Sequence, residues 1–174
     1  MDTTIKAQFA RSFSGRLYVR INGWEAPLRP SKMRIHDAAT SLVAKVKNGW
    51  LMAGGSDDSA ALDFSFDSMT EDRLHFHISL YGTPERQKLG ISRNGFLGFY
   101  QVADVTDYWK IEPLQLTAQG LLCNLRDHQG QRVALTADTQ ACDSAVVPRN
   151  ADQKPAYLNV SQGESYEFVL KLNE

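Results

Sequence analysis

The feature that most constrains the fold of this chain is a five-residue pattern that occurs twice. A basic residue is followed by Asn-Gly, an aromatic residue and Leu, at residues 47–51 and again at residues 93–97. Asn-Gly between alternating apolar runs is the strongest short-range signal for a β-hairpin, because both central turn residues need a positive φ. We therefore expect a hairpin at each copy of the pattern.

Similar strand-like segments surround both copies in the same order. Residues 62–66 follow the first copy and residues 108–111 follow the second at almost the same distance, while residues 16–21 are echoed by residues 73–78. A degraded third copy runs from Gly120 to Leu170, with Asp-Thr in place of Asn-Gly. Three units of about 45 residues, each with about four strand signals, predict about twelve strands.

The apolar residues follow a period of two nearly everywhere, and no amphipathic helix is evident, so the predicted class is all-β. Ile5, Ala7 and Phe9 alternate with polar residues in the lead-in, which suggests an edge strand there. We expect one domain over residues 1–174. Its units and its two long loops have the following approximate boundaries: units at 15–69, 70–114 and 115–174, and loops at 23–41 and 143–163.

The segment from Leu89 to Gly98, followed by Tyr108 to Ile111, resembles repeats of the β-trefoil superfamily, in its fascin-like branch. The resemblance covers most of residues 15–172. It implies three pseudo-repeats of four strands that form a six-strand barrel with a cap of three hairpins. The ricin-type lectin branch has Gln-x-Trp in the closing strand, whereas this chain keeps an aromatic there without the Gln. The aromatic residues at those places are Phe64, Trp109 and Tyr166.

The two cysteines, Cys123 and Cys142, lie within one predicted repeat. In secreted trefoil lectins such a pair forms an intra-repeat disulfide, and the resemblance allows the same here. Two free buried thiols are the state we favour in a protein without a secretory signal.

The composition is that of a soluble globular chain, with 43% hydrophobic and 22% charged residues. No segment approaches the ~20 apolar residues of a membrane-spanning helix, and Lys6, Gln8 and Arg11 interrupt any secretory signal. We expect a cytoplasmic protein, or one exported without a cleavable signal. Residues 1–50 hold nine Lys/Arg against three Asp/Glu, but these charges are dispersed, so we expect no nucleic-acid partner.

No catalytic motif is present: HExxH, GxSxG, a P-loop and paired CxxC are all missing from the sequence. We therefore expect a non-enzymatic protein without a cofactor or a metal site. His75 and His77 fall on the same side of a predicted strand. With no third ligand patterned nearby, the spacing favours a solvent-facing pair over a metal site.

Carbohydrate recognition is the leading functional hypothesis. It requires an aromatic face for the sugar ring and a carboxylate or amide for its hydroxyls. Loops and turns of the three units offer these groups, and the candidate ligand-binding residues are Trp24, Asn94, Phe96, Asp127 and His128. Trp24 is expected to be an exposed aromatic in an irregular loop. Phe96 matches an aromatic in the other copy of the pattern, and such repeated aromatics are more often core residues.

The alternative hypothesis is a protein–protein interaction module that uses the two long loops. An inhibitor, a toxin subunit or a cytoskeletal-type binder would fit this description. The partner is thus a glycan or a protein, and the chain is expected to act as a monomer.

Overall fold

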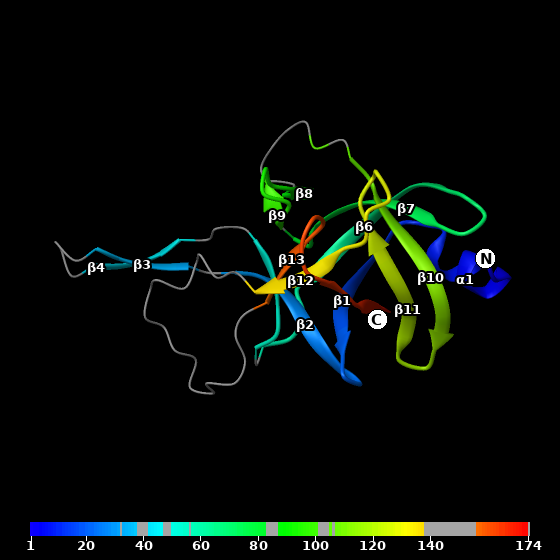
Figure 1. Cartoon of the computed structure of the whole chain (residues 1–174). Helices are drawn as coiled ribbons and strands as arrows, with labels where there is room; N and C mark the ends of the chain where they lie inside the picture. Colours follow the sequence, from blue (N-terminus) through cyan, green and yellow to red (C-terminus); the bar gives the residue numbers. More distant parts are fainter. Residues whose placement is uncertain are drawn as a thin grey trace.

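The structure is a computed structural model, and the prediction of an all-β class is confirmed (Figure 1). Strands dominate the described residues, together with one short helix. The residues that the structure describes are 1–31, 33–37, 42–46, 50–55, 57–82, 87–100, 105, 107–137 and 156–173.

Six antiparallel strands pair in a closed ring, in which each strand has two ring neighbours. In ring order they are β1 (Phe13–Ile21), β6 (Ala61–Met69), β7 (Leu74–Leu80), β10 (Trp109–Thr117), β11 (Gly120–Arg126) and β15 (Glu167–Leu172). Alternate residues of β1 point inward and outward, as the period of two predicts. Leu17 and Val19 are buried, whereas Arg20 is exposed.

Phenylalanine side chains fill one end of this ring. Phe13 stacks on Phe64 with ring centroids 4.8 Å apart, and Phe76 meets both rings edge-on. Offset and edge-to-face pairs of this kind add about 0.5–1.5 kcal/mol each beyond the apolar area they bury. These rings therefore form an aromatic cluster within a core that is otherwise largely aliphatic.

Three pairs of strands extend the ring. The pairs are β2 (Trp24–Pro30) with β5 (Leu51–Ala53), β8 (Lys88–Ile91) with β9 (Leu97–Tyr100), and β12 (Ala134–Ala137) with β13 (Ala156–Asn159). The short strand β14 (Glu164–Ser165) adds to β12. The three pairs contact one another, since β13 also pairs with β5 and isolated bridges join Trp50 to Gly98 and Phe96 to Asn159.

The prediction of an irregular loop over residues 23–41 is wrong for most of that segment. It contains β2 and a further strand, β3 (Met33–Asp37), which pairs with β4 (Leu42–Val46) in a separate two-stranded sheet. The missed signal is Asn22-Gly23, which forms the tight turn between β1 and β2 with φ values of 47° and 87°. Two central residues at positive φ match the right-handed twist of the flanking strands.

The predicted edge strand in the lead-in is also wrong, because residues Thr3–Phe9 form helix α1. The Asp2 carboxylate caps this helix by accepting hydrogen bonds from the N–H groups of Thr4 and Ile5. Ile5 and Phe9 are both buried. A spacing of four residues puts them on one helical face, so the apparent alternation of period two concealed a helical pair.

The predicted hairpin at residues 93–97 is confirmed, but its turn differs from the expected one. The N–H of Gly95 donates to the carbonyl of Ser92 at 3.0 Å, so Arg93 and Asn94 are the central residues of the turn. Gly95 has a φ of 82°, whereas Asn94 does not have a positive φ. Only one of the two residues therefore adopts the expected left-handed conformation.

Several predictions fall on residues outside the described part of the chain. They concern the first Asn-Gly copy at 48–49, Cys142, and most of the loop at 143–163. Cys123 is a free, buried thiol. Among the described residues, no helix has the length and apolarity needed to cross a membrane.

Candidate functional site

A hollow of about 440 Å³ lies between the turn that joins β1 to β2 and the turn that joins β10 to β11. We call it the two-turn hollow. Its lining consists of Arg20, Gly23, Glu25, Gln115, Thr117, Gln119, Leu122, Val169 and Lys171. Arg20 comes from the exposed side of β1, so the hollow lies on the outside of the ring.

Local hydrogen bonds fix the second of these turns. The hydroxyl of Thr117 donates to the carbonyl of Gly120 at 2.8 Å and accepts from the N–H of Gln119 at 3.2 Å. Gly120 has a φ of 141°, and a side chain there would meet the carbonyl of Leu170. The turn is thus held in one conformation against β15, which gives the hollow a fixed wall.

The floor of the hollow is apolar. Leu122 and Val169 are register partners on β11 and β15 and are 8% and 5% exposed. They line the hollow from the outer face of the ring, where polar residues are the rule. A ligand with an apolar face could therefore pack on this floor.

One wall carries an ion pair that is already satisfied. The Nζ of Lys171 lies 2.5 Å from a carboxylate oxygen of Glu25 and 4.7 Å above the ring of Tyr18. The Tyr18 hydroxyl donates to Asp58, and burial together with this hydrogen bond raises the pKa of Tyr18 to about 12. The ring beneath Lys171 is therefore neutral at physiological pH.

Three other polar side chains line the hollow. In the described part of the chain, the side chains of Arg20, Gln115 and Gln119 make no hydrogen bond. The nearest partner of Arg20 is Glu167, with nitrogen and oxygen 3.7 Å apart, which is longer than a hydrogen bond. The hollow therefore offers one guanidinium and two amides above an apolar floor.

This arrangement suits recognition of a polar molecule. Side-chain amides both donate and accept hydrogen bonds, and the guanidinium only donates. Such groups around a small apolar surface fix the orientation of a ligand with hydroxyl groups.

Trp24, predicted as an exposed aromatic, is 42% exposed, and it begins β2 immediately after the Asn22-Gly23 turn. Its neighbours Gly23 and Glu25 line the two-turn hollow. Because successive residues of a strand point to opposite faces, Trp24 lies on the other face of the hairpin from Glu25. The structure therefore puts it beside the hollow but not in its lining.

Asn94 and Phe96 lie together in the turn between β8 and β9. The carbonyl of Asn94 accepts a hydrogen bond from the side chain of Asn159 at 3.0 Å, while the Asn94 side chain is exposed. Phe96 stacks on Trp50 with ring centroids 4.2 Å apart and meets Tyr157 edge-on. One face of the Phe96 ring is thus already covered by another aromatic.

Asp127 and His128 lie in the turn that follows β11. Asp127 is 3% exposed, and its carboxylate accepts from the N–H of Gln131 at 2.7 Å. His128 has its Nδ1 3.5 Å from a carboxylate oxygen of Asp107, and its carbonyl accepts from Lys110. The carboxylate of Asp127 therefore stabilises its own turn. Taken together, the five predicted residues lie in three separate regions of the structure.

The residues of the two-turn hollow follow no pattern that locates the site in the sequence. Arg20 appeared only as part of an alternating strand, and Gln115 and Gln119 followed no motif. The one signal that could have located the hollow is Asn22-Gly23, the same dipeptide that was used elsewhere in the chain.

The expectation that His75 faces solvent is wrong. His75 is 7% exposed, stacks on Tyr108 with ring centroids 4.7 Å apart, and has its Nδ1 2.9 Å from the hydroxyl of Ser68. Burial and, to a lesser degree, the nearby charge of Lys110 lower the pKa of His75. Within the described part of the chain, no group of three potential metal ligands occurs.

A second hollow, of about 350 Å³, lies where the first residues of β1 meet the last residues of β15. We call it the rim groove, and its lining is Arg11, Phe13, Ser14, Tyr81, Leu172 and Asn173. Tyr81 is 59% exposed, which is the largest value among the exposed large hydrophobic residues that the structure describes. The rim groove is therefore more apolar in character than the two-turn hollow.

Comparisons of the chain with protein-family models, with curated proteins and with solved structures found no match.

Proposed function

We propose that this protein is a non-enzymatic binding module on a β-trefoil scaffold, and that it recognises carbohydrate in the two-turn hollow. Two independent observations support the two parts of this proposal. The first concerns the strand pairing and the second concerns the lining of the hollow.

The strand pairing supports the trefoil scaffold. A trefoil repeat contributes its first and fourth strands to a six-strand ring and its second and third strands to a hairpin. The ring pairs β1 with β6, β7 with β10 and β11 with β15 as consecutive ring strands of the chain, with β2–β5, β8–β9 and β12–β13 between them. This order agrees with repeats at about 15–69, 70–114 and 115–174.

The observation that carries the binding proposal is the contrast between the floor and the walls of the two-turn hollow. Leu122 and Val169 form an apolar floor, and the side chains of Gln115, Gln119 and Arg20 make no hydrogen bond within the described residues. A pyranose ring has the matching surface, with C–H groups on one face and hydroxyls around its edge. A volume of about 440 Å³ is within the range of small-ligand pockets.

The direct test is binding of the purified protein to an immobilised glycan array, repeated with the Gln115→Ala, Gln119→Ala double variant. The proposal predicts a specific signal that the double variant loses. The matched control is Gln131→Ala, which removes the side chain of an exposed glutamine in the turn after β11. A blank array for the folded protein, or a signal that the double variant retains, would refute carbohydrate binding at this site.

The rim groove supports a second candidate function, a protein–protein interaction module. Tyrosine and arginine are enriched at protein interfaces, and here Tyr81 and Arg11 line one groove beside Leu172. A blank glycan array combined with a partner that Tyr81→Ala releases would favour this function. Retention of that partner by Tyr81→Ala would exclude the rim groove as its binding surface.

A further inference from the structure

We propose that the ligand of the two-turn hollow is an acidic saccharide whose carboxylate is bound by Arg20. This inference rests on the proposed carbohydrate function and adds the chemical class of the sugar. It starts from the position of Arg20 between two glutamates on neighbouring strands.

Arg20 has two acidic neighbours and forms only one long, surface-exposed ion pair, with Glu167. In the strand register it lies opposite Glu25 on β2 and opposite Glu167 on β15. Glu25 is occupied by Lys171, whose Nζ is 2.5 Å from its carboxylate. Glu167 is 3.7 Å from the guanidinium, and both side chains of this pair are about half exposed. Such a surface pair contributes little, so a ligand can displace it at small cost.

Three other arginines of the chain have guanidinium groups that donate hydrogen bonds to protein acceptors. Arg29 donates to Asp57 at 2.9 Å, Arg126 donates to Glu112 at 2.8 Å, and Arg16 donates to the carbonyl of Ser59. Arg20 makes no such bond within the described residues, although it lines the larger of the two hollows. Its donors therefore face a space that a ligand can fill.

A carboxylate is the group that best matches these donors. The planar guanidinium binds a carboxylate through two parallel hydrogen bonds, which are roughly twice as strong as bonds between neutral groups. The amides of Gln115 and Gln119 are neutral and suit the sugar hydroxyls. A uronic acid combines the two kinds of group on one ring and leaves its C–H face for Leu122 and Val169.

The test is a calorimetric titration with galacturonate oligosaccharides and with the same oligosaccharides after reduction of the carboxyl group to an alcohol. We expect the acidic form to bind at least about tenfold more tightly, because a charge-assisted pair replaces a neutral hydrogen bond. Added salt should reduce this preference, since the pair lies at the surface. Glu167→Gln should strengthen binding of the acidic form, because it removes the competing carboxylate.

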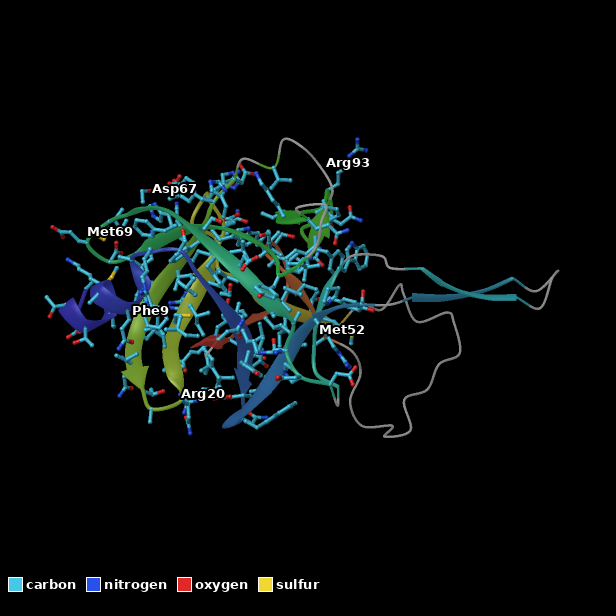
Figure 2. All side chains as sticks on the ribbon, turned by 180° about the vertical axis from the view of Figure 1, so that it is seen from behind. Phe9, Arg20, Met52, Asp67, Met69 and Arg93 are labelled. Atoms are coloured by element: carbon cyan, nitrogen blue, oxygen red, sulfur yellow. The ribbon has the colours of Figure 1, made fainter. Side chains whose placement is uncertain are left out.

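The variant that assigns the preference to one residue is Arg20→Gln, with Arg93→Gln as its control. Arg93 is an exposed arginine that lies far from Arg20 (Figure 2). Each variant removes one positive charge, so the two differ only in where the charge is lost. We expect Arg20→Gln to bind the acidic and reduced forms equally and Arg93→Gln to behave as wild type. Arg20→Lys should recover only part of the preference, because an ammonium lacks the fork of donors.

The outcomes separate this inference from the proposed function. Equal binding of both forms by the wild-type protein overturns the acidic class while carbohydrate binding stands. A preference that survives Arg20→Gln overturns the role of Arg20. Binding of neither these nor any other saccharide refutes the proposed function, and the inference with it.

Discussion

Two sets of polar turns in this molecule use their side chains in opposite ways. In the turns after β11 and β13, Asp127 and Asn159 are buried and bind backbone groups of their own turns. At the two-turn hollow, the side chains of Gln115 and Gln119 make no hydrogen bond in the described part of the chain, and Arg20 has only a 3.7 Å ion pair with Glu167. In this protein, therefore, a polar side chain in a turn is available to a ligand only where the backbone of the turn does not require it as a hydrogen-bond partner.

Among the turn residues that bind their own backbone, Asn159→Ala is expected to lower the free energy of unfolding the most. Its side-chain oxygen accepts from the N–H groups of Ser161 and Gln162, and its amide donates to the carbonyl of Asn94. Each of these three hydrogen bonds contributes about 0.5–1.5 kcal/mol net, so we expect a loss of about 2–4 kcal/mol in the free energy of unfolding. Urea denaturation measures it, and a loss below about 0.5 kcal/mol would show that these bonds do not hold the turn.

Asp127→Ala should have the next largest effect, about 1–3 kcal/mol in the free energy of unfolding. The substitution leaves the N–H of Gln131 without its carboxylate acceptor. Asp127→Asn keeps an acceptor oxygen and should lose less. Saccharide affinity of the folded variants should be unchanged. If Asp127→Ala instead abolished binding at unaltered stability, Asp127 would be a ligand residue and the comparison would fail.

Gln115→Ala should have the opposite effect to Asp127→Ala, with stability kept and saccharide binding weakened. It should leave the free energy of unfolding within about 0.5 kcal/mol of wild type while weakening saccharide binding by about 0.5–1.5 kcal/mol, the net value of one hydrogen bond. Parallel denaturation and calorimetry measure both quantities. A variant that is destabilised with unaltered affinity would show that this glutamine serves the fold.

His75 is intermediate between the two kinds of side chain, because it is buried but only one of its ring nitrogens, Nδ1, has a hydrogen-bond partner, the hydroxyl of Ser68. Its pKa in the folded protein is lowered below the ordinary 6.5, chiefly by burial. The unfolded chain therefore takes up the proton first, and stability falls as the pH drops below 6.5. His75→Gln should flatten this slope in denaturation measured between pH 7 and pH 5, with His77→Gln, a partly exposed histidine two residues along the same strand, as the control variant. An unchanged slope in His75→Gln would assign it to other groups.

The smallest effect is expected for Trp24→Ala. Trp24 lies on the opposite face of its hairpin from Glu25, so saccharide affinity should change by less than about twofold. Calorimetry on the folded variant measures this. A tenfold loss would extend the site across the hairpin and make Trp24 a ligand-binding residue, as the sequence predicts.

The all-β class could be predicted because period-two alternation reports directly which face of a strand is buried. The hairpin at Asn94 could also be predicted, since glycine is needed at one left-handed position. Helix α1 could not be read from Ile5, Ala7 and Phe9 alone, because residues four apart satisfy both periods. Asp2, which caps the helix, is a signal that distinguishes it from a strand.

The candidate site was less predictable, for a physical reason. Asp127 and His128 are predicted as ligand-binding residues because polar residues in a turn can bind sugars. The sequence does not show which backbone groups a carboxylate will bind. Gln115, Gln119 and Arg20 come together only because β1 and β10 lie on either side of β11 and β15 in the ring. That neighbourhood depends on pairing between distant segments.

The most direct test of the two-turn hollow as the binding site is amide chemical-shift mapping of the ¹⁵N-labelled protein during titration with a saccharide that binds on the array. The account predicts shifts concentrated at Arg20, Gly23, Gln115, Gln119 and Lys171, with the turn from Asp127 to Gln131 unchanged. Shifts confined to that turn, or to the turn from Ser92 to Phe96, would contradict it.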